Sequence, residues 1–401
     1  MWEIIKANQR KSSVLFVLMG IVLIGLGFLI GWGVAPNNGG AFIGLIIAIL
    51  VWFIMSIIAV TSGAKIMLSA SDAKEVTPDV HPQLFNVVDE MRIAAGIPKM
   101  PKVYIINTDA PNAFATGMSP DNAIIAVTAG LLARMNRDEL QGVVAHEMSH
   151  IVNRDIRFMT LAGVMLGSIV IISEIFLRGL FFSGGRGRRD SGGGQGQIII
   201  MIIAVVFAIL APIMAQLLYF AISRKREYLA DASAVRLTRY PEGLASALEK
   251  ISVNTAEMPM ANKVTAPLYI CNPLKGKGMK MSDLTSTHPP ISERIRILRA
   301  IAGGAGFTNY QKAFNSVKGT AKTIIPSAEL NNQETIEFRQ GSAMAAFADH
   351  KTTTRTSYDI MMKVDNYSFI NCDCGMKLKV PSDFSGNTVI CPRCGKKHQI
   401  R

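Results

Sequence analysis

The chain has 401 residues, of which 49% are hydrophobic and 18% are charged. Its formal net charge is +13, but the lysines and arginines gather at the ends of long apolar runs, a distribution that fits anionic lipid at a membrane surface better than nucleic acid. We therefore do not expect a nucleic-acid-binding protein. The sequence also contains no internal repeat and no phosphate-binding loop.

Two apolar runs open the chain. They cover about residues 14–35 and 41–62, no charged residue occurs between Lys11 and Lys65, and Pro36-Asn-Asn-Gly-Gly40 separates them. Each run is long enough to cross a hydrocarbon core of about 30 Å. The first run is too long for a signal peptide, lacks a convincing cleavage site and is followed at once by a second run. We predict an uncleaved transmembrane hairpin.

The stretch that follows this hairpin predicts a soluble α+β part. Residues 83–95 have helical periodicity, and residues 102–107 form a short predicted strand. Residues 112–117 and 123–128 flank a turn-like segment, residues 118–122, and predict a β-hairpin. An edge strand here could hold an extended peptide by backbone pairing, but a purely structural hairpin would have the same sequence pattern.

An H-E-x-x-H motif, His146-Glu147-Met-Ser-His150, lies on a predicted helix for which Asp138 is a suitable N-cap. Histidines four residues apart share a helix face, so both imidazoles can bind one Zn²⁺. Glu147 lies beside that face and can act as the general base toward a metal-bound water. The motif also occurs by chance, but with only 6 histidines in the chain, this spacing favours a metal site over a surface helix.

A third ligand is available further along the chain. Catalytic zinc usually keeps three protein ligands and one open position. Glu227 can complete a His₂Glu set, and Asp231, one helical turn later, can orient an imidazole ligand and set its tautomer. The alternative is an ordinary juxtamembrane helix of basic and acidic residues. The presence of the H-E-x-x-H helix favours a metal-binding role for Glu227 over this alternative.

A second pair of apolar runs lies between the motif and Glu227. Residues 158–177 and 198–222 are apolar apart from Glu174, and a glycine-rich linker, residues 183–196, joins them. A hairpin returns the chain to the place where it began. It would therefore bring Glu227 back to the histidine pair and place the metal site at the membrane surface.

Basic residues flank the open ends of both hairpins, and the positive-inside rule places them in the cytoplasm. Four arginines in the second hairpin are an exception: Arg178, Arg186, Arg188 and Arg189. Either the rule is violated there or the second hairpin is re-entrant, and Glu174 raises the same question because an intramembrane carboxylate should face a polar cavity or a partner. We favour four spans in the cell (inner) membrane, with the metal site on the cytoplasmic side.

Two further short motifs stand beside the H-E-x-x-H motif and Glu227-x-x-x-Asp231. They are Asn112-Ala-Phe-Ala-Thr-Gly117 and Thr287-His288-Pro-Pro290. The combination resembles the M48 membrane-embedded zinc metalloproteases, and the HtpX-type heat-shock proteases more than the prenyl-protein (CAAX) type, over about residues 1–302. The resemblance implies a gluzincin-type endopeptidase that acts on misfolded membrane proteins, with Asn112 and Ala113 on the strand that binds substrate.

A hydrolase of this kind also needs a group that stabilises the oxyanion. His288 or Arg294 could serve after the chain folds back. Alternatively, Pro289-Pro290 simply starts a helix whose buried face includes Ile291 and Ile295. We favour this second interpretation for His288.

Four cysteines near the C-terminus form two knuckles, Cys372-Asp-Cys374 and Cys391-Pro-Arg-Cys394, and a glycine follows each. The pattern is typical of a zinc ribbon, a closed Cys₄ structural site. Two disulfides are the alternative, which a cytosolic location disfavours. Ribbons bind protein or nucleic acid or only stabilise a fold, so the pattern indicates no partner.

We thus expect a mainly α integral membrane protein with four transmembrane helices, an α+β catalytic core with a small β-sheet, and a zinc ribbon. Its cofactors would be one catalytic and one structural Zn²⁺, and its substrates membrane proteins or peptides. A non-catalytic scaffold that recruits partners through the ribbon, and a prenyl-protein protease, are the alternatives. The expected segments are the first hairpin (1–63), the part with the H-E-x-x-H helix (64–157), the second hairpin (158–222), the helical part with the third ligand (223–302), a loosely structured connector with one short helix (303–363) and the ribbon (364–401).

Overall fold

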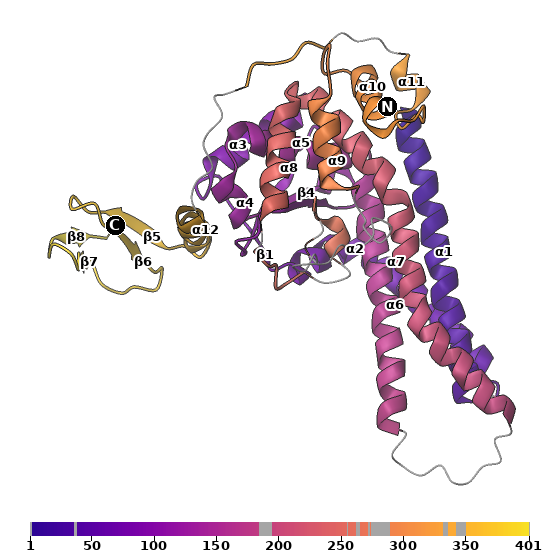
Figure 1. Ribbon diagram of the computed structural model, residues 1–401. Coiled ribbons are helices and arrows are strands. Elements are labelled where there is room, and N and C mark those ends of the chain that lie inside the picture. Colours follow the sequence, from indigo (N-terminus) through magenta and orange to yellow (C-terminus); the bar gives the residue numbers. More distant parts are fainter. Residues whose placement is uncertain are drawn as a thin grey trace.

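The computed structural model has three regions (Figure 1). Long helices form a bundle, a rounded α+β domain covers one end of the bundle, and a small β module projects to one side of that domain. The N-terminus lies beside the rounded domain, and the C-terminus lies in the small module. The structure describes residues 2–35, 38–183, 195–254, 256–261, 265–271, 273, 289–331, 336–341 and 350–400.

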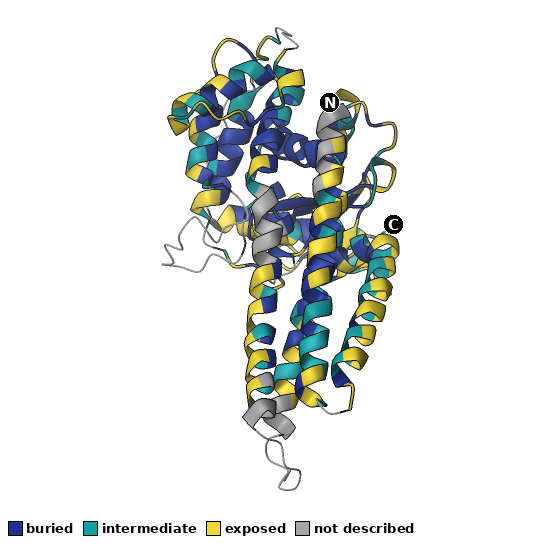
Figure 2. Cartoon of the chain, turned by 90° about the vertical axis from the view of Figure 1, so that its right-hand side faces the viewer, coloured by how far each residue is buried: buried dark blue, intermediate teal, exposed yellow. Residues whose placement is uncertain are grey.

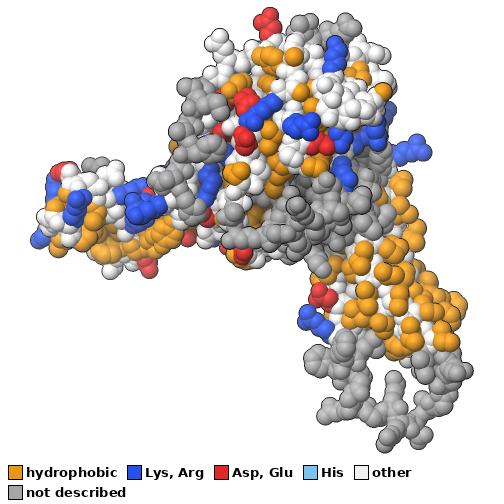
Figure 3. Space-filling view, in the orientation of Figure 1, with side chains coloured by type: hydrophobic (Ala, Val, Ile, Leu, Met, Phe, Trp, Pro, Cys, Tyr) orange, Lys and Arg blue, Asp and Glu red, His pale blue; other side chains and the backbone are white. Residues whose placement is uncertain are grey.

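The bundle helices are α1 (Trp2–Val34), α2 (Gly40–Ala70), α6 (Asp155–Ser183) and α7 (Gln195–Thr238). Among the described residues, three stretches are long and apolar enough to cross a membrane: Ser12–Val34, Gly40–Ala70 and Asp155–Gly179. A shorter apolar stretch, Met201–Ala215, lies in α7. Hydrophobic side chains cover the visible outside of the bundle (Figure 3), as a lipid-facing surface requires. The fourth crossing stays a prediction.

Helix α7 is a single element of 44 residues. It begins with the second apolar run of the second hairpin and continues without interruption into the rounded domain, where it carries the segment with Glu227 and Asp231. The predicted second hairpin ends at residue 222, where the apolar run gives way to charged residues, but a change from apolar to charged side chains does not end a helix. The third candidate ligand is therefore rigidly connected to the membrane part.

A four-stranded sheet forms the base of the rounded domain, in the order β1-β2-β4-β3. The predicted hairpin is confirmed, since β3 and β4 pair antiparallel, and β3 is the edge strand. Strand β2 runs parallel to β4 and antiparallel to β1. The bounds are β1 Ala73–Glu75, β2 Lys102–Ile106, β3 Ala113–Thr116 and β4 Ile124–Thr128, and the predicted helix over residues 83–95 is α3 (Pro82–Ala94).

The central helix of the domain is α5 (Arg137–Val152), which carries the H-E-x-x-H motif. Its N-cap is Asn136, not Asp138 as expected. The Asn136 side chain accepts a hydrogen bond from the Glu139 backbone N–H (2.9 Å), and the Glu139 carboxylate accepts one from the Asn136 N–H (2.9 Å). This reciprocal capping box satisfies two orphan donors at once. Asp138 instead accepts a hydrogen bond from Arg339 (2.9 Å).

The expected connector, residues 303–363, holds more structure than its sequence indicates. Its described residues form three helices, and α10 buries Phe307, Tyr310 and Phe314 against the rounded domain. The spacing of these aromatic residues is helical, but polar and small residues around them obscured the period. The remaining helix bounds are α4 Ala129–Arg134, α8 Pro241–Val253, α9 Ile291–Arg299, α10 Phe307–Lys318, α11 Ser327–Leu330 and α12 His350–Val364.

The small module consists of α12 and the two antiparallel hairpins that follow it. Both strands expected between the cysteine knuckles, residues 377–380 and 388–390, are present, and each pairs with a strand outside that interval. The bounds are β5 Ser368–Asn371, β6 Lys377–Val380, β7 Thr388–Ile390 and β8 Lys397–Gln399.

Burial is concentrated in the rounded domain (Figure 2). Helix α5 is buried from Asp138 to Ile151, whereas the described bundle helices expose much of their length. A helix buried on all sides must satisfy its polar side chains internally, and α5 carries several of them. The close approach of α5 to α8 depends on Gly142, because a Cβ there would lie 2.6 Å from the Leu244 nitrogen.

Replacing Gly142 with alanine should therefore destabilise the domain by about 1–3 kcal/mol, the usual cost of overpacking a core. Thermal unfolding of the purified protein in detergent measures the effect as a lower midpoint. Gly179→Ala is the matched control, since a Cβ at Gly179 would meet nothing within 4 Å. Equal midpoints for the two variants would contradict the proposed α5–α8 contact.

Candidate metal centre

Two helices bring the three predicted ligands together. His146 and His150 lie one turn apart on α5, and Glu227 reaches them from α7. The two imidazole Nε2 atoms are 3.3 Å apart. The Glu227 carboxylate oxygens lie 3.5 Å from Nε2 of His146 and 3.6 Å from Nε2 of His150. All three side chains are buried.

These separations fit one zinc ion. Zinc–ligand bonds of about 2.0–2.2 Å in a tetrahedron place neighbouring ligand atoms about 3.3–3.6 Å apart. The three observed distances fall in that range, and the facing atoms are imidazole nitrogens and a carboxylate, the donor set of a His₂Glu catalytic site. The residues therefore fit the ion that the sequence predicted.

Each imidazole is held from behind by an aspartate. The Nδ1 atom of His146 lies 2.9 Å from Asp231, and that of His150 lies 3.2 Å from Asp155. Such a contact sets the tautomer that leaves Nε2 available as a ligand and raises its basicity. Asp231 was expected in this role, whereas Asp155 was missed.

Asp155 reaches His150 because of a sharp turn between α5 and α6. Arg154 adopts a positive φ of 62°, a conformation that non-glycine residues rarely take, and α6 begins at the next residue. Asp155 also pairs with Arg226 of α7 (3.5 Å). A carboxylate five residues after the second histidine is a weak sequence signal, because only this turn directs it back to the ring.

Arg294 lies behind the site on α9 and is fully buried. Its guanidinium donates two hydrogen bonds to Asp231 (2.7 and 2.8 Å) and lies 3.6 Å from Glu227. Burial alone would lower the pKa of Arg294, but Asp231 and Glu227 raise it. This permanent cation offsets the buried carboxylates. Its oxyanion role stays a prediction, while these contacts show that it positions Asp231.

The helix expected after Pro289-Pro290 is α9, which starts at Ile291 and buries Ile291 and Leu298. The structural interpretation of this segment is therefore confirmed, and the same helix also carries Arg294. His288, the other oxyanion candidate, lies outside the described residues.

Glu147 lies on α5, where this helix packs on the edge strand β3. Burial raises the pKa of Glu147, although the charges of His146 and His150 oppose this. A carboxylate with a raised pKa is better suited to accept and return a proton near neutrality. Burial lowers the pKa of His146, but hydrogen bonds to Asp231 and Glu227 outweigh it and raise that pKa to about 9. The carboxylates around the histidine pair thus favour positive charge at this place.

Asn112 and Ala113 stand at the start of the edge strand β3 and are contacted by the chain's own residues. The Ile270 N–H donates a hydrogen bond to the Ala113 carbonyl (2.9 Å). The Asn112 side chain donates to the Cys271 carbonyl (2.8 Å) and accepts from the Cys271 N–H (3.3 Å). A cavity of about 350 Å³ adjoins this pair and is lined by Asn112, Cys271 and Met258. A larger cavity of about 480 Å³ contains none of the candidate metal ligands.

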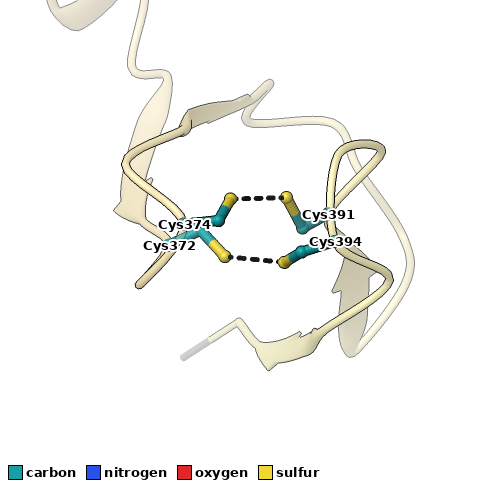
Figure 4. A group of neighbouring side chains, drawn as sticks. All are labelled: Cys372, Cys374, Cys391 and Cys394. Atoms are coloured by element: carbon teal, nitrogen blue, oxygen red, sulfur yellow. Dashed lines mark hydrogen bonds between the residues drawn. The ribbon is translucent and has the colours of Figure 1, made fainter.

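The four cysteines of the small module face one another in pairs (Figure 4). The sulfur atoms of Cys372 and Cys394 are 3.4 Å apart, and those of Cys374 and Cys391 are 3.6 Å apart. A disulfide would need about 2.05 Å, whereas four thiolates around one zinc ion lie about 3.8 Å apart. The geometry fits a closed Cys₄ zinc site.

Metal analysis of the purified protein should find two zinc ions per chain, because the two ligand sets are complete and separate. His146→Ala should remove only one ion, and Cys391→Ser only the other. Each variant serves as the control for its partner. A variant that lost both ions, or neither, would contradict the assignment.

Asp155→Asn should weaken zinc binding at the histidine site about 10- to 100-fold, the usual effect of removing a carboxylate that orients a ligand. Competition with a chromophoric chelator measures this affinity without any assay of activity. The exposed Asp121 provides the control Asp121→Asn. Unchanged affinity in Asp155→Asn would show that the contact with His150 does not support the metal.

Comparison with known proteins agrees with this geometry. The model of Peptidase family M48 matches residues 78–302. A protein named Protease HtpX homolog from Dictyoglomus thermophilum is 47% identical over 298 residues, 74% of this chain and 94% of that protein. The homologue from Listeria monocytogenes is 45% identical over 307 residues, which are 74% of this chain and 99% of that protein. The homologue from Streptococcus agalactiae is 42% identical over 299 residues, which are 75% of this chain and 99% of that protein.

Among solved structures, the crystal structure of S. mikatae Ste24p aligns with 74% of this chain and 67% of its own, at 21% identity and a TM-score of 0.38. A score this low does not by itself establish a common fold. The family match and the identity to several proteins over nearly their whole length do not depend on it. The chain belongs to peptidase family M48 and is a multi-pass membrane zinc metalloprotease similar to the HtpX proteases.

Proposed function

We propose that this metalloprotease is an endopeptidase that degrades misfolded or damaged membrane proteins from the cytoplasmic side of the inner membrane. The observation that supports the proposal best is the convergence of His146, His150 and Glu227 where the bundle meets the rounded domain, with Glu147 beside the edge strand. A site at that level can meet polypeptide that leaves the bilayer. The HtpX relatives named above add to the proposal.

The mechanism follows from the residues around the site. Bound at the His₂Glu set, Zn²⁺ would polarise the scissile carbonyl and lower the pKa of a water molecule. Glu147 takes a proton from that water and delivers it to the leaving amine. Asp231 and Asp155 keep the two imidazoles in one tautomer. Arg294 holds Asp231 in place and offsets part of the negative charge of the carboxylates around the ligand set.

Substrate binding would use the edge strand β3. An extended peptide can pair with the backbone of such a strand and place its scissile bond near Glu147. The Ala113 carbonyl already accepts a hydrogen bond from Ile270. A peptide must therefore replace Ile270 at this position or pair further along β3, at Ala115, whose backbone groups face away from β4.

Four crossings and a cytoplasmic site complete the proposal. The part of α7 that precedes Arg224 begins at Gln195 and corresponds to about 43 Å of helix, which is long enough to cross a hydrocarbon core of about 30 Å. Lys65 and Lys74 at the domain end of α2 favour the cytoplasm for that end. The exposed Glu174 and Arg178 pair with each other (3.2 Å) near the other end of α6, which reduces the cost of placing both close to the bilayer.

The alternatives have less support. A non-catalytic scaffold would not need Glu147 next to a complete ligand set. Prenyl-protein processing would need a binding site for a lipidated C-terminus, and the described cavities give no specific observation in its favour. The ribbon follows the M48-matched residues, so its role is a separate question.

Glu147→Gln should reduce cleavage of an unfolded membrane substrate, and any self-cleavage, by at least about 10²-fold, because an amide cannot accept the proton. Gel-based cleavage in liposomes measures the effect. Zinc content should stay unchanged, which separates loss of the base from loss of the metal. Glu337→Gln, at an exposed position, is the matched control. Undiminished cleavage by Glu147→Gln would reject the proposed role of this residue.

A further inference from the structure

The small module is held firmly against the rounded domain. Helix α12 packs on α4, and two hydroxyl groups of α12 donate hydrogen bonds to Asp109: Ser357 at 2.8 Å and Thr354 at 3.0 Å. At the other end of α12, Asp365 pairs with Lys74 (2.6 Å). Several contacts along one helix fix its direction better than a single tether would.

The ribbon is in turn fixed to α12. Asp359 of this helix pairs with Lys377 (2.8 Å) and Lys379 (2.7 Å) of β6. The ammonium group of Lys379 also lies 5.0 Å from the centre of the Tyr358 ring. The orientation of the ribbon relative to the bundle therefore follows from named contacts on both sides of α12.

These contacts place the start of the ribbon close to the membrane. The partner of Asp365 is Lys74, which follows the end of α2 at Ala70 by four residues. Lys65, on the last turns of the same helix, is exposed and marks the level where the apolar surface ends. Five helical residues above Lys65 rise about 7.5 Å, while the headgroup layer is about 5–7 Å thick. The ribbon thus begins at about the height of the headgroups.

The underside of the module is apolar. This is the side that faces the way in which the bundle extends from the rounded domain. Figure 3 shows hydrophobic side chains gathered along this underside, with one acidic side chain at its lower edge, while most of the charged side chains in view lie on the front and ends. Three large hydrophobic residues of the module are strongly exposed: Tyr358 (59%), Ile390 (56%) and Phe384 (44%). Aromatic rings next to lysines are typical of surfaces that rest in a membrane interface.

The charge of the module fits an acidic surface. Lysine and arginine outnumber aspartate by eight to four in residues 350–400, which contain no glutamate. Four thiolates around one Zn²⁺ would remove two positive charges and leave the module basic. Basic residues near a bilayer are attracted to anionic lipid, whereas a purely apolar protein partner would offer them no opposite charge.

We propose that the underside of the zinc ribbon is a membrane-docking surface whose partner is the anionic headgroup layer of the same bilayer that α2 crosses. The ribbon then gives the rounded domain a second attachment to the membrane, in addition to the bundle. Because Asp109 precedes the edge strand by four residues, the docked module also holds β3 at a constant height above the lipid. This inference needs α2 to span the bilayer and does not depend on proteolysis.

Site-specific photo-crosslinking of the full chain in lipid nanodiscs tests the proposal. A benzophenone amino acid replaces Phe384 or Ile390 in separate variants, and Phe338 in the control, an exposed aromatic residue of the rounded domain. After illumination, mass spectrometry counts adducts with lipid. Zinc content of two ions per chain confirms that the ribbon is folded in each variant.

We expect lipid adducts at positions 384 and 390 to exceed those at 338 several-fold, and to increase when phosphatidylglycerol replaces part of the phosphatidylcholine. Added salt should reduce the increase, because it screens the attraction of the basic module to the charged lipid. Adducts no more frequent than at 338 would overturn the proposal. So would crosslinks from 384 and 390 to protein, whether a second copy of this chain or another polypeptide.

Discussion

The meeting of α5 and α7 around buried charge is the constraint on which the rest of the structure depends. Glu147, Glu227, Asp231 and Asp155 are all buried at this place. Four carboxylates removed from water would repel one another and lose their hydration, which costs far more than the net stability of a domain. The imidazoles and Arg294 compensate part of this charge, and a divalent ion would compensate more. Folding of the rounded domain and metal binding are therefore energetically linked.

The surrounding elements can be understood from this constraint. Helix α5 is buried on all sides because it must present its polar face to α7 while its other faces pack on α8, α3 and β3. Helix α9 supplies the cation from behind. The turn at Arg154 is strained, and the contacts of Asp155 with His150 and Arg226 are what this conformation makes possible. Each of these features positions a charged or polar group around the histidine pair.

Much of the site could be predicted from sequence because its signals are local. The histidines lie on one helix face, and the second hairpin returns the chain, so Glu227 was found despite the long interval. Asp155 was missed because its contact depends on the turn at Arg154. The pairing of Ile270 with Ala113 has no local signal, since the two residues are far apart in sequence. The helices of residues 303–363 were missed because the core they join is formed by distant segments.

The continuity of α7 has a mechanical consequence. If α7 crosses the bilayer as proposed, a tilt or vertical shift of its apolar part would move Glu227 and Asp231, because both side chains belong to the same helix and face α5. A metal ion bound to His146 and His150 of α5 and to Glu227 of α7 would resist that movement, because it would connect the two helices. The thickness and lateral tension of the lipid would then influence the separation of His150 and Glu227.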